Sequence, residues 1–205
     1  MIFAIIPVHN RLDKTINCLN SLEKQDIIQD LNIIMIDDGS NDNTQDYVSK
    51  NFPAVTILKG DGSLFWGGAI NLGIDYALRR KKTNDWILIL NNDVELSEDT
   101  ISNLILIAEK NQRKSVVIPL TLDAKDRKTV IKSGTIILSW FFNITKHVFE
   151  SMNVDQIKNT EPVIVDIFTG RCVLHPVEIF EITGNYDAAN FRHYCCDDEF
   201  SIRIK

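Results

Sequence analysis

The stretch LNIIMIDDGS, residues 31–40, sets the pattern for the fold, because a run that is apolar except for Asn32 ends there in two carboxylates, a glycine and a serine. An apolar run without polar alternation predicts a strand buried on both faces, here residues 31–36. Strands of that kind belong to parallel sheets that helices cover on both sides. The rest of the chain should therefore supply more buried strands and the helices between them.

The same pattern recurs on both sides of this stretch. Apolar runs predict further strands at residues 2–6, 55–58 and 86–90. Amphipathic or capped segments predict helices at residues 13–24 and 43–51, one that opens at Gly67-Gly68, and one with Ser97 as its N-cap. This alternation predicts an α/β fold in a single domain, with a mostly parallel central sheet flanked by helices.

The second half of the chain is less regular. Residues 115–119 and 163–168 are predicted to form strands, and residues 130–138 a hairpin. Pro176 is expected at the first position of a helix that stops before Gly184. No internal repeat or linker divides the chain.

Composition and termini narrow the class of protein. The net charge is -6 and no basic stripe stands out, which argues against a nucleic-acid partner. No signal peptide is evident at residues 1–7, and no run reaches the roughly 18 apolar residues of a spanning helix. We therefore expect a cytoplasmic protein whose four cysteines are reduced. His193, Cys195 and Cys196 lack further partners at zinc-ligand spacing.

Polar residues follow two of the predicted strands, where parallel sheets bind ligands. Asp37 and Asp38 either hydrogen-bond a pyrimidine base or ribose hydroxyls, or form a solvated turn that caps the next helix. Asn91-Asn92-Asp93 suits Mg²⁺ or Mn²⁺ with a diphosphate as a further ligand, or is an Asx-rich turn before a helix.

Two further clusters have both a functional and a structural interpretation. Gly67 and Gly68 at a helix start would let a backbone approach a phosphate, and a tight turn explains them equally well. The acidic run Asp197-Asp198-Glu199 is either catalytic or the solvated first turn of a helix.

Taken together, these pieces resemble the family-2 glycosyltransferases over nearly the whole chain. The final D-x-E-F-S-x-R segment is similar to that of the rhamnosyltransferase-like branch. The matching segments, in the family's order, are Pro7 to Arg11, Ile36 to Thr44, Trp66 to Gly73, Leu90 to Asp93, Thr169 to Cys172, Gly184 to Asp187, and Asp197 to Arg203.

The resemblance implies a GT-A (Rossmann-like) fold and a role for each matching residue. Asp197 would be the catalytic base, because counting back from Arg203 gives the family's spacing, although Cys196 stands where the family usually has Glu. Asp93 would hold the divalent metal, with Asn91 in place of the first Asp of the family's DxD motif. The donor-binding residues would be Pro7, His9, Asn10, Arg11, Asp37, Asp38, Gly67, Gly68, Asn71 and Asn92.

The implied activity is that of an inverting, hexosyltransferase-type enzyme that moves a sugar from a nucleoside-diphosphate sugar to an acceptor hydroxyl. The acceptor would be a saccharide or lipid-linked, in cell-surface polysaccharide or glycoconjugate synthesis, with peripheral association at the inner face of the membrane. Two alternatives remain: a sugar-1-phosphate nucleotidyltransferase, which would need a glycine-rich loop after the first strand, and an inactive glycosyltransferase-like binding domain.

The two halves of the domain are expected to divide the work. Residues 1–110 would bind the nucleotide sugar and residues 111–205 would face the acceptor. Family members commonly continue further and often supply a late His to the metal. We therefore expect the acceptor-side half to be C-terminally truncated or the chain to be a minimal catalytic domain.

Overall fold

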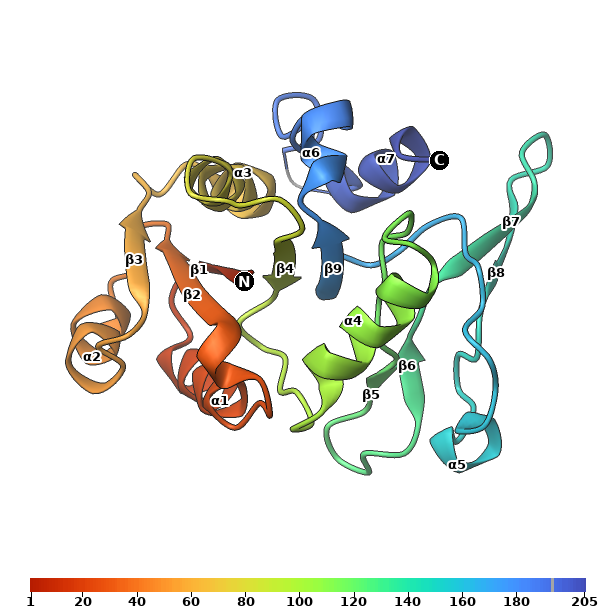
Figure 1. The fold of residues 1–205 in the computed structure, drawn as a ribbon, viewed down its shortest axis with the longest axis horizontal. Helices are drawn as coiled ribbons and strands as arrows, with labels where there is room; N and C mark the ends of the chain where they lie inside the picture. The colour runs from red at the N-terminus through yellow and green to blue at the C-terminus, as the bar shows by residue number, and fades with distance from the viewer. Residues whose placement is uncertain (193) are drawn as a thin grey trace.

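A five-stranded sheet forms the centre of the computed structural model, which describes residues 1–192 and 194–205 (Figure 1). The strand order is β3-β2-β1-β4-β9, and the first four strands are parallel, as the sequence predicts. The last strand, β9, runs antiparallel beside β4. The bounds are Ile2–Val8 for β1, Leu31–Asp37 for β2, Thr56–Lys59 for β3, Trp86–Leu90 for β4 and Cys172–Pro176 for β9.

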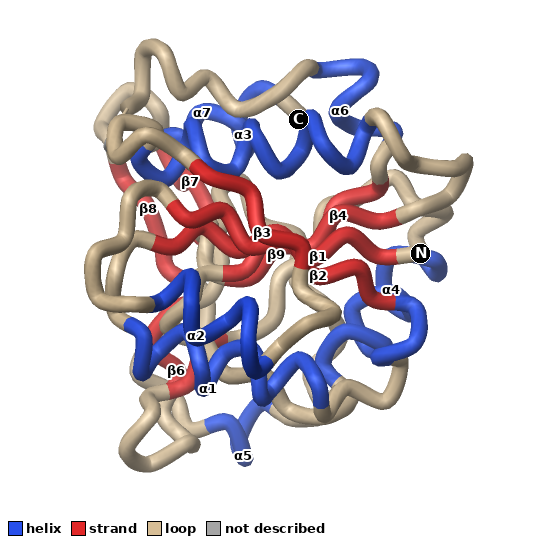
Figure 2. The backbone as a smooth tube through the Cα atoms, turned by 90° about the vertical axis from the view of Figure 1, so that its left-hand side faces the viewer, coloured by secondary structure: helices blue, strands red, loops and turns tan. Residues whose placement is uncertain are grey.

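Helices cover both faces of this sheet. Figure 2 shows α3, α6 and α7 on one side and α1, α2 and α4 on the other. Successive residues of β1 enter the two opposite cores, Phe3 and Ile5 one and Ala4 and Ile6 the other, which is why the strand reads as continuously apolar. The helix bounds are Leu12–Glu23 (α1), Thr44–Asn51 (α2), Phe65–Leu78 (α3), Thr100–Lys110 (α4), Glu178–Thr183 (α6) and Cys196–Arg203 (α7).

Helix α3 packs unusually close to the sheet. A Cβ at Gly73 would lie 2.5 Å from Ile5 Cγ2 and 3.0 Å from Ile36 Cδ1. The absent side chain therefore lets the helix approach β1 and β2 and fixes where its N-terminal turn lies. That helix begins at Phe65, two residues before the predicted Gly67.

Short strands and loops make up most of the second half, and several predictions for it are wrong. Residues 130–138 hold two strands that do not pair with each other: β6 (Val130–Lys132) pairs with β5 (Thr121–Leu122), and β7 (Thr135–Ser139) pairs with β8 (Ile144–His147). The predicted strands at residues 115–119 and 163–168 are reduced to single bridges, Val117 to Leu174 and Thr135 to Ile167. Two short helical turns, Ile28–Asp30 (η1) and Val154–Ile157 (α5), complete the described elements.

Two predicted helix starts are also wrong. Pro176 ends β9 instead of starting a helix, and α6 begins at Glu178. Since β9 lies at the end of the strand order, a residue without an N–H is tolerated there. Helix α4 has Asp99, not Ser97, at its N-cap position, and Ser97 O instead accepts from Thr100 N.

Candidate active site

The polar segments singled out in the sequence gather at the carboxyl ends of β1, β2 and β4. His9 and Asn10 follow β1, Asp38 follows β2, and Asn91 follows β4. This is the edge at which open α/β sheets bind ligands. Antiparallel β9 begins at the same edge, so the segment before it joins the cluster.

Asp38 connects the loop after β1 to the segment before α3 by hydrogen bonds that we call the Asp38 latch. Its carboxylate is buried, with Oδ1 accepting from Gly62 N at 2.8 Å and Oδ2 accepting from Phe65 N at 3.0 Å. Its backbone oxygen lies 2.6 Å from His9 Nδ1. The chain's own amides therefore engage both oxygens of the carboxylate that was expected to contact the base.

The loops after β1 and β2 are held together by further hydrogen bonds. Asn10 N donates to Ser40 Oγ at 2.8 Å, and Asn10 Oδ1 accepts from Asn41 N at 2.9 Å. Asp37, also buried, accepts from Ser40 N at 2.9 Å. Asn10 and Arg11 both have positive φ, 60° and 64°, so the β1 loop turns sharply toward its neighbour.

Trp66 fixes the orientation of Asn91. The indole Nε1 donates to Asn91 Oδ1 at 2.8 Å. An indole N–H can only donate, so the Asn91 atom that faces it must be the oxygen. Of the two expected metal ligands, Asn91 thus has its side-chain oxygen in a hydrogen bond, and the carboxylate of Asp93 is the one more readily available to a metal. Its carboxylate is 38% exposed and has Arg11 Nη1 at 3.7 Å, a pair that is weak and readily exchanged.

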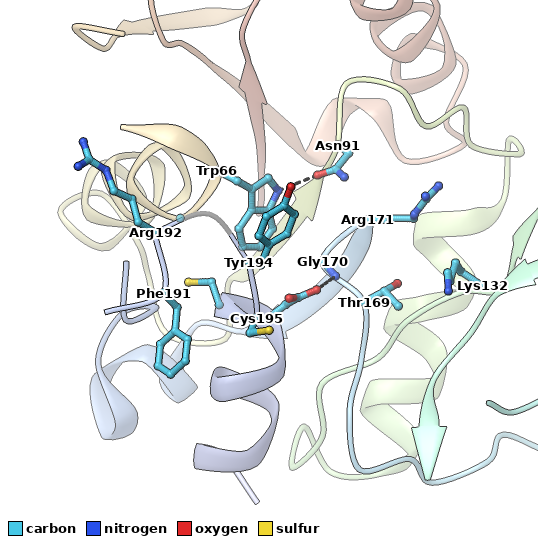
Figure 3. Close-up of a pocket in the computed structure, with 13 residues that line it drawn as sticks. Trp66, Asn91, Lys132, Thr169, Gly170, Arg171, Phe191, Arg192, Tyr194 and Cys195 are labelled. Atoms are coloured by element: carbon cyan, nitrogen blue, oxygen red, sulfur yellow. Dashed lines mark hydrogen bonds between the residues drawn. The ribbon is translucent and has the colours of Figure 1, made fainter. Parts of the chain in front are cut away.

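The base candidate Asp197 lies opposite Asn91 and is held by the segment before β9. Its Oδ2 accepts from Gly170 N at 2.7 Å (Figure 3). Gly170 in turn packs under the Trp66 ring, where a Cβ would lie 2.5 Å from Cζ2. A Trp66–Tyr186 edge contact, with ring centroids 5.6 Å apart, supports the indole from behind. Trp66 thus contacts both Asn91, at the end of β4, and Gly170, which holds the carboxylate of Asp197.

Asp197 and Asp198 differ in their surroundings. Asp197 lines a cavity of about 400 Å³, whereas Asp198 does not. Burial, together with the neighbouring charge of Asp197, raises the pKa of the Asp198 carboxyl. Asp197 Oδ1 also accepts from the backbone N–H of Asp198 at 3.2 Å.

Three cations line the same cavity, and the sequence interpretation missed all of them. Lys132, Arg171 and Arg192 surround it, with Asp197 as the one carboxylate among its lining residues, in a chain where Asp and Glu outnumber Lys and Arg. Arg171 directly precedes β9, and its backbone oxygen accepts from Asn91 N at 2.8 Å. The remaining lining residues are Trp66, Gly67, Asn91, Thr169, Gly170, Phe191, Tyr194, Cys195 and Cys196.

Several expected donor-binding residues make contacts within the fold. The side-chain amide of Asn71 makes two hydrogen bonds with the backbone of Tyr186. Asn71 Nδ2 donates to Tyr186 O at 2.8 Å, and Asn71 Oδ1 accepts from Tyr186 N at 3.1 Å. Asn92 Nδ2 donates to Thr15 Oγ1 at 3.0 Å. Pro7 lies inside β1, and a Cβ on Gly68 would face Leu64. Of the expected residues, Gly67, Asn91 and Asp197 line the cavity.

A divalent metal would have a single firm protein ligand here. Among residues 1–192 and 194–205 no three His, Cys, Asp or Glu side chains come together as a metal cluster. Asp93 nevertheless fits, because Mg²⁺ and Mn²⁺ are commonly held by one or two carboxylates plus substrate phosphates and water. His193, part of the rejected zinc alternative, lies outside the described residues.

The sequence profile described as Glycosyl transferase family 2 matches residues 3–175, most of the chain and all five strands of the main sheet. The chain belongs to this family. An uncharacterized glycosyltransferase of Mycoplasma pneumoniae is 30% identical over 125 residues, which are 58% of this chain and 39% of that protein. Its counterpart in Mycoplasma genitalium is 28% identical over 123 residues. The chain thus spans about two fifths of the length of these curated relatives.

Solved glycosyltransferases share the fold. TarS of S. aureus (residues 1–349) has a TM-score of 0.67 at 15% identity, covering 99% of this chain and 54% of that one. GalNAc-T7, solved with UDP, GalNAc and Mn²⁺, has a TM-score of 0.74 at 17% identity, covering 100% and 40%. A mannosyltransferase from Pyrobaculum calidifontis, solved with GDP-Man and Mn²⁺, has a TM-score of 0.61 at 17% identity, covering 98% and 50%. These likenesses establish the GT-A fold of this family member.

Within the described residues, no helix has the length and apolar character that crossing a bilayer requires.

Proposed function

We propose that this family-2 glycosyltransferase is an inverting enzyme of the hexosyltransferase type, working in the cytoplasm on cell-surface polysaccharide or glycoconjugates. It would transfer a sugar from a nucleoside-diphosphate sugar to an acceptor hydroxyl. The observation that carries the proposal is the placement of Asp197 on a cavity shared with Asn91. A base and the strand-end motif that precedes Asp93 then face one reaction centre.

Asp197 would accept the proton of the acceptor hydroxyl as that oxygen attacks the anomeric carbon. The amides of Gly170 and Asp198 hold its two oxygens in place, so the carboxylate keeps one orientation toward the cavity. One base without a separate nucleophile is consistent with a single displacement and inversion.

The donor would lie across the ends of β1, β2 and β4. The nucleoside is assigned to the loops that hold Asp37 and Asp38, and the diphosphate to the region of Asn91 and Asp93. Asn91, with its oxygen held by Trp66, would turn its amide N–H groups to the ligand. Asp93 would hold Mg²⁺ or Mn²⁺, which neutralises charge on the leaving diphosphate when bound. Relatives of this fold solved with UDP-GlcNAc or with GDP-Man and Mn²⁺ support such a donor.

The nucleotidyltransferase alternative finds no support in the loop after β1. That loop reads His9-Asn10-Arg11 and contains no glycine to cradle a triphosphate. An inactive binding domain would retain donor binding without transfer. A rhamnosyl donor, suggested by the D-x-E-F-S-x-R segment, belongs to the same proposal.

Calorimetry with UDP-, dTDP- and GDP-sugars, in Mn²⁺ and in EDTA, tests the proposal directly. We expect one donor to bind in Mn²⁺ and to weaken at least about tenfold in EDTA, because the sequence has no lysine-rich phosphate loop that would replace the metal at Asp93. Equal affinity in both buffers would contradict the metal assignment. Binding without release of nucleoside diphosphate in the presence of acceptor would identify a binding domain.

A further inference from the structure

The β7–β8 hairpin ends in an exposed aromatic tip. Residues 138–144, which we call the hairpin tip, contain Trp140, Phe141 and Phe142 in succession, with exposed fractions of 69%, 89% and 71%. Leu138 and Ile144 beside them are exposed as well. Figure 1 shows this hairpin projecting from the edge of the molecule, away from the central sheet.

Nothing in the fold calls for three aromatic residues at this place. Phe141 and Phe142 contact each other edge to face, with ring centroids 4.9 Å apart, and neither belongs to the two cores of the described chain. Contiguous exposed apolar surface of this kind marks an interaction site. The question is therefore which partner fits a narrow tip rather than a flat face.

The available area favours lipid over a second copy of the chain. An aromatic side chain buries about 150–250 Å², so the three rings offer roughly 450 Å² at their exposed fractions. A stable protein interface takes about 800 Å² from each partner. Insertion into a bilayer needs no complementary surface, and Trp and Phe favour the interface between headgroups and acyl chains.

The charges around the hairpin tip fit an anionic surface. The chain as a whole is acidic, yet no Asp or Glu occurs between Lys132 and Glu150. Lys146 is exposed on β8, two residues from the tip. At the base of the hairpin, Asp166 Oδ2 accepts from Ile137 N, and the ion pair with Lys205 offsets the charge of this carboxylate.

We propose that the hairpin tip docks this protein on an anionic lipid surface by inserting Trp140, Phe141 and Phe142 into the headgroup region. Docking would bring the cavity near the membrane, because Lys132 lines the cavity and Ser133-Gly134 connect it directly to β7. The five residues of β7 span about 17 Å, so the cavity would face an acceptor attached to lipid. The acceptor statement rests on the proposed transferase function, whereas the docking does not.

Flotation of the full chain with vesicles tests the docking without donor, metal or acceptor. Vesicles of 70% phosphatidylcholine and 30% phosphatidylglycerol should carry the parent protein, and Phe141→Ser with Phe142→Ser should lower the partition coefficient at least about 100-fold. The control Leu106→Ser with Ile182→Ser removes exposed apolar side chains elsewhere and should leave partitioning unchanged. Pure phosphatidylcholine should bind the parent about tenfold less.

Trp140 provides a second reading on the same samples. In a Trp66→Phe, Trp86→Phe background it is the one remaining tryptophan, and its emission should shift to the blue on vesicles. Equal flotation of the tip variant and the parent would overturn the proposal. The proposal would also be overturned if the parent protein does not bind vesicles and instead forms dimers that the tip variant does not form. Failure of donor binding, by contrast, would count against the transferase and leave these results standing.

Discussion

Replacing Asp38 by asparagine should destabilise this protein, although the change removes no carbon atom. Both carboxylate oxygens accept backbone N–H groups, from Gly62 at 2.8 Å and Phe65 at 3.0 Å, in a site that is 5% exposed. Asparagine has one oxygen and one NH₂ group, so the backbone N–H of either Gly62 or Phe65 would face the NH₂ group, which is itself a donor. A hydrogen bond to a charged group contributes about 1.5–3 kcal/mol. We expect a loss of about 2 kcal/mol in the free energy of unfolding.

A loss of that size should lower the melting temperature by about 4–8 °C for a chain of this length. Circular dichroism melts measure the shift, and hydrogen exchange should rise locally across residues 60–66. Asp37→Asn is the matched control, because the Asp37 carboxylate accepts a hydrogen bond from Ser40 N at 2.9 Å, and an amide oxygen can keep that bond. A melting temperature within 1 °C of the parent for Asp38→Asn would refute the latch and return Asp38 to a purely ligand-binding role.

Asp197→Asn should lower the rate of sugar transfer by about 10²–10⁴-fold with donor affinity nearly unchanged, and Asp198→Asn should keep most activity. A nucleotide-release assay measures both rates. If Asp198→Asn is the inactive variant and Asp197→Asn is active, the base is Asp198. Gly170→Ala should lower turnover more than donor affinity, because its Cβ would meet the Trp66 ring at 2.5 Å and lie 3.3 Å from Asp197 Oδ2; an unchanged turnover would contradict that contact. His175 is buried and its pKa is lowered to about 3, so between pH 6.5 and 3 the unfolded chain binds the extra proton and stability falls as pH falls. The loss should reach about 2 kcal/mol by pH 5, and denaturant titrations of His175→Phe should lack this component.

The fold of residues 1–110 follows from local patterns. The strands β1, β2 and β4 are buried on both faces, so their apolar runs identify them without tertiary information. Helix α3 was expected for the same kind of reason, from its apolar stripe. Its start is displaced to Phe65 because the Asp38 latch captures that amide, a contact between segments 27 residues apart.

The fold of residues 111–205 could not be predicted in the same way. Its strands are two to five residues long, and their partners are set by register with distant segments, so residues 130–138 looked like one hairpin and are halves of two. Strand β9 was missed because Pro176 reads as a helix start, whereas an edge position tolerates it. No local motif marks the cavity residue Lys132, and the matching segment Thr169 to Cys172 contains Arg171 without indicating that it lines a cavity.

For the site, the position of the polar motifs was easier to predict than their contacts. The strand-end motifs and Asp197 do gather at one edge of the sheet, as parallel topology requires. Whether a polar side chain faces a ligand or the scaffold depends on its hydrogen-bond partners, and these lie far away in sequence. Asn71 binds Tyr186 and Asn92 binds Thr15, and neither partner could be inferred from spacing.

The neighbouring strands β4 and β9 are joined by the whole segment from Asn91 to Arg171. Closing so long a loop is slow, because the chain loses conformational entropy before the contacts between β4 and β9 form and stabilise it. Yet each doubling of loop length adds only about 0.6 kcal/mol. We therefore expect the sheet to tolerate changes of length in the loops of this segment, outside α4, which packs in the core. We also expect the Asn91–Arg171 backbone bond, and with it the reaction centre, to form late in folding, after β1, β2 and β4 have assembled.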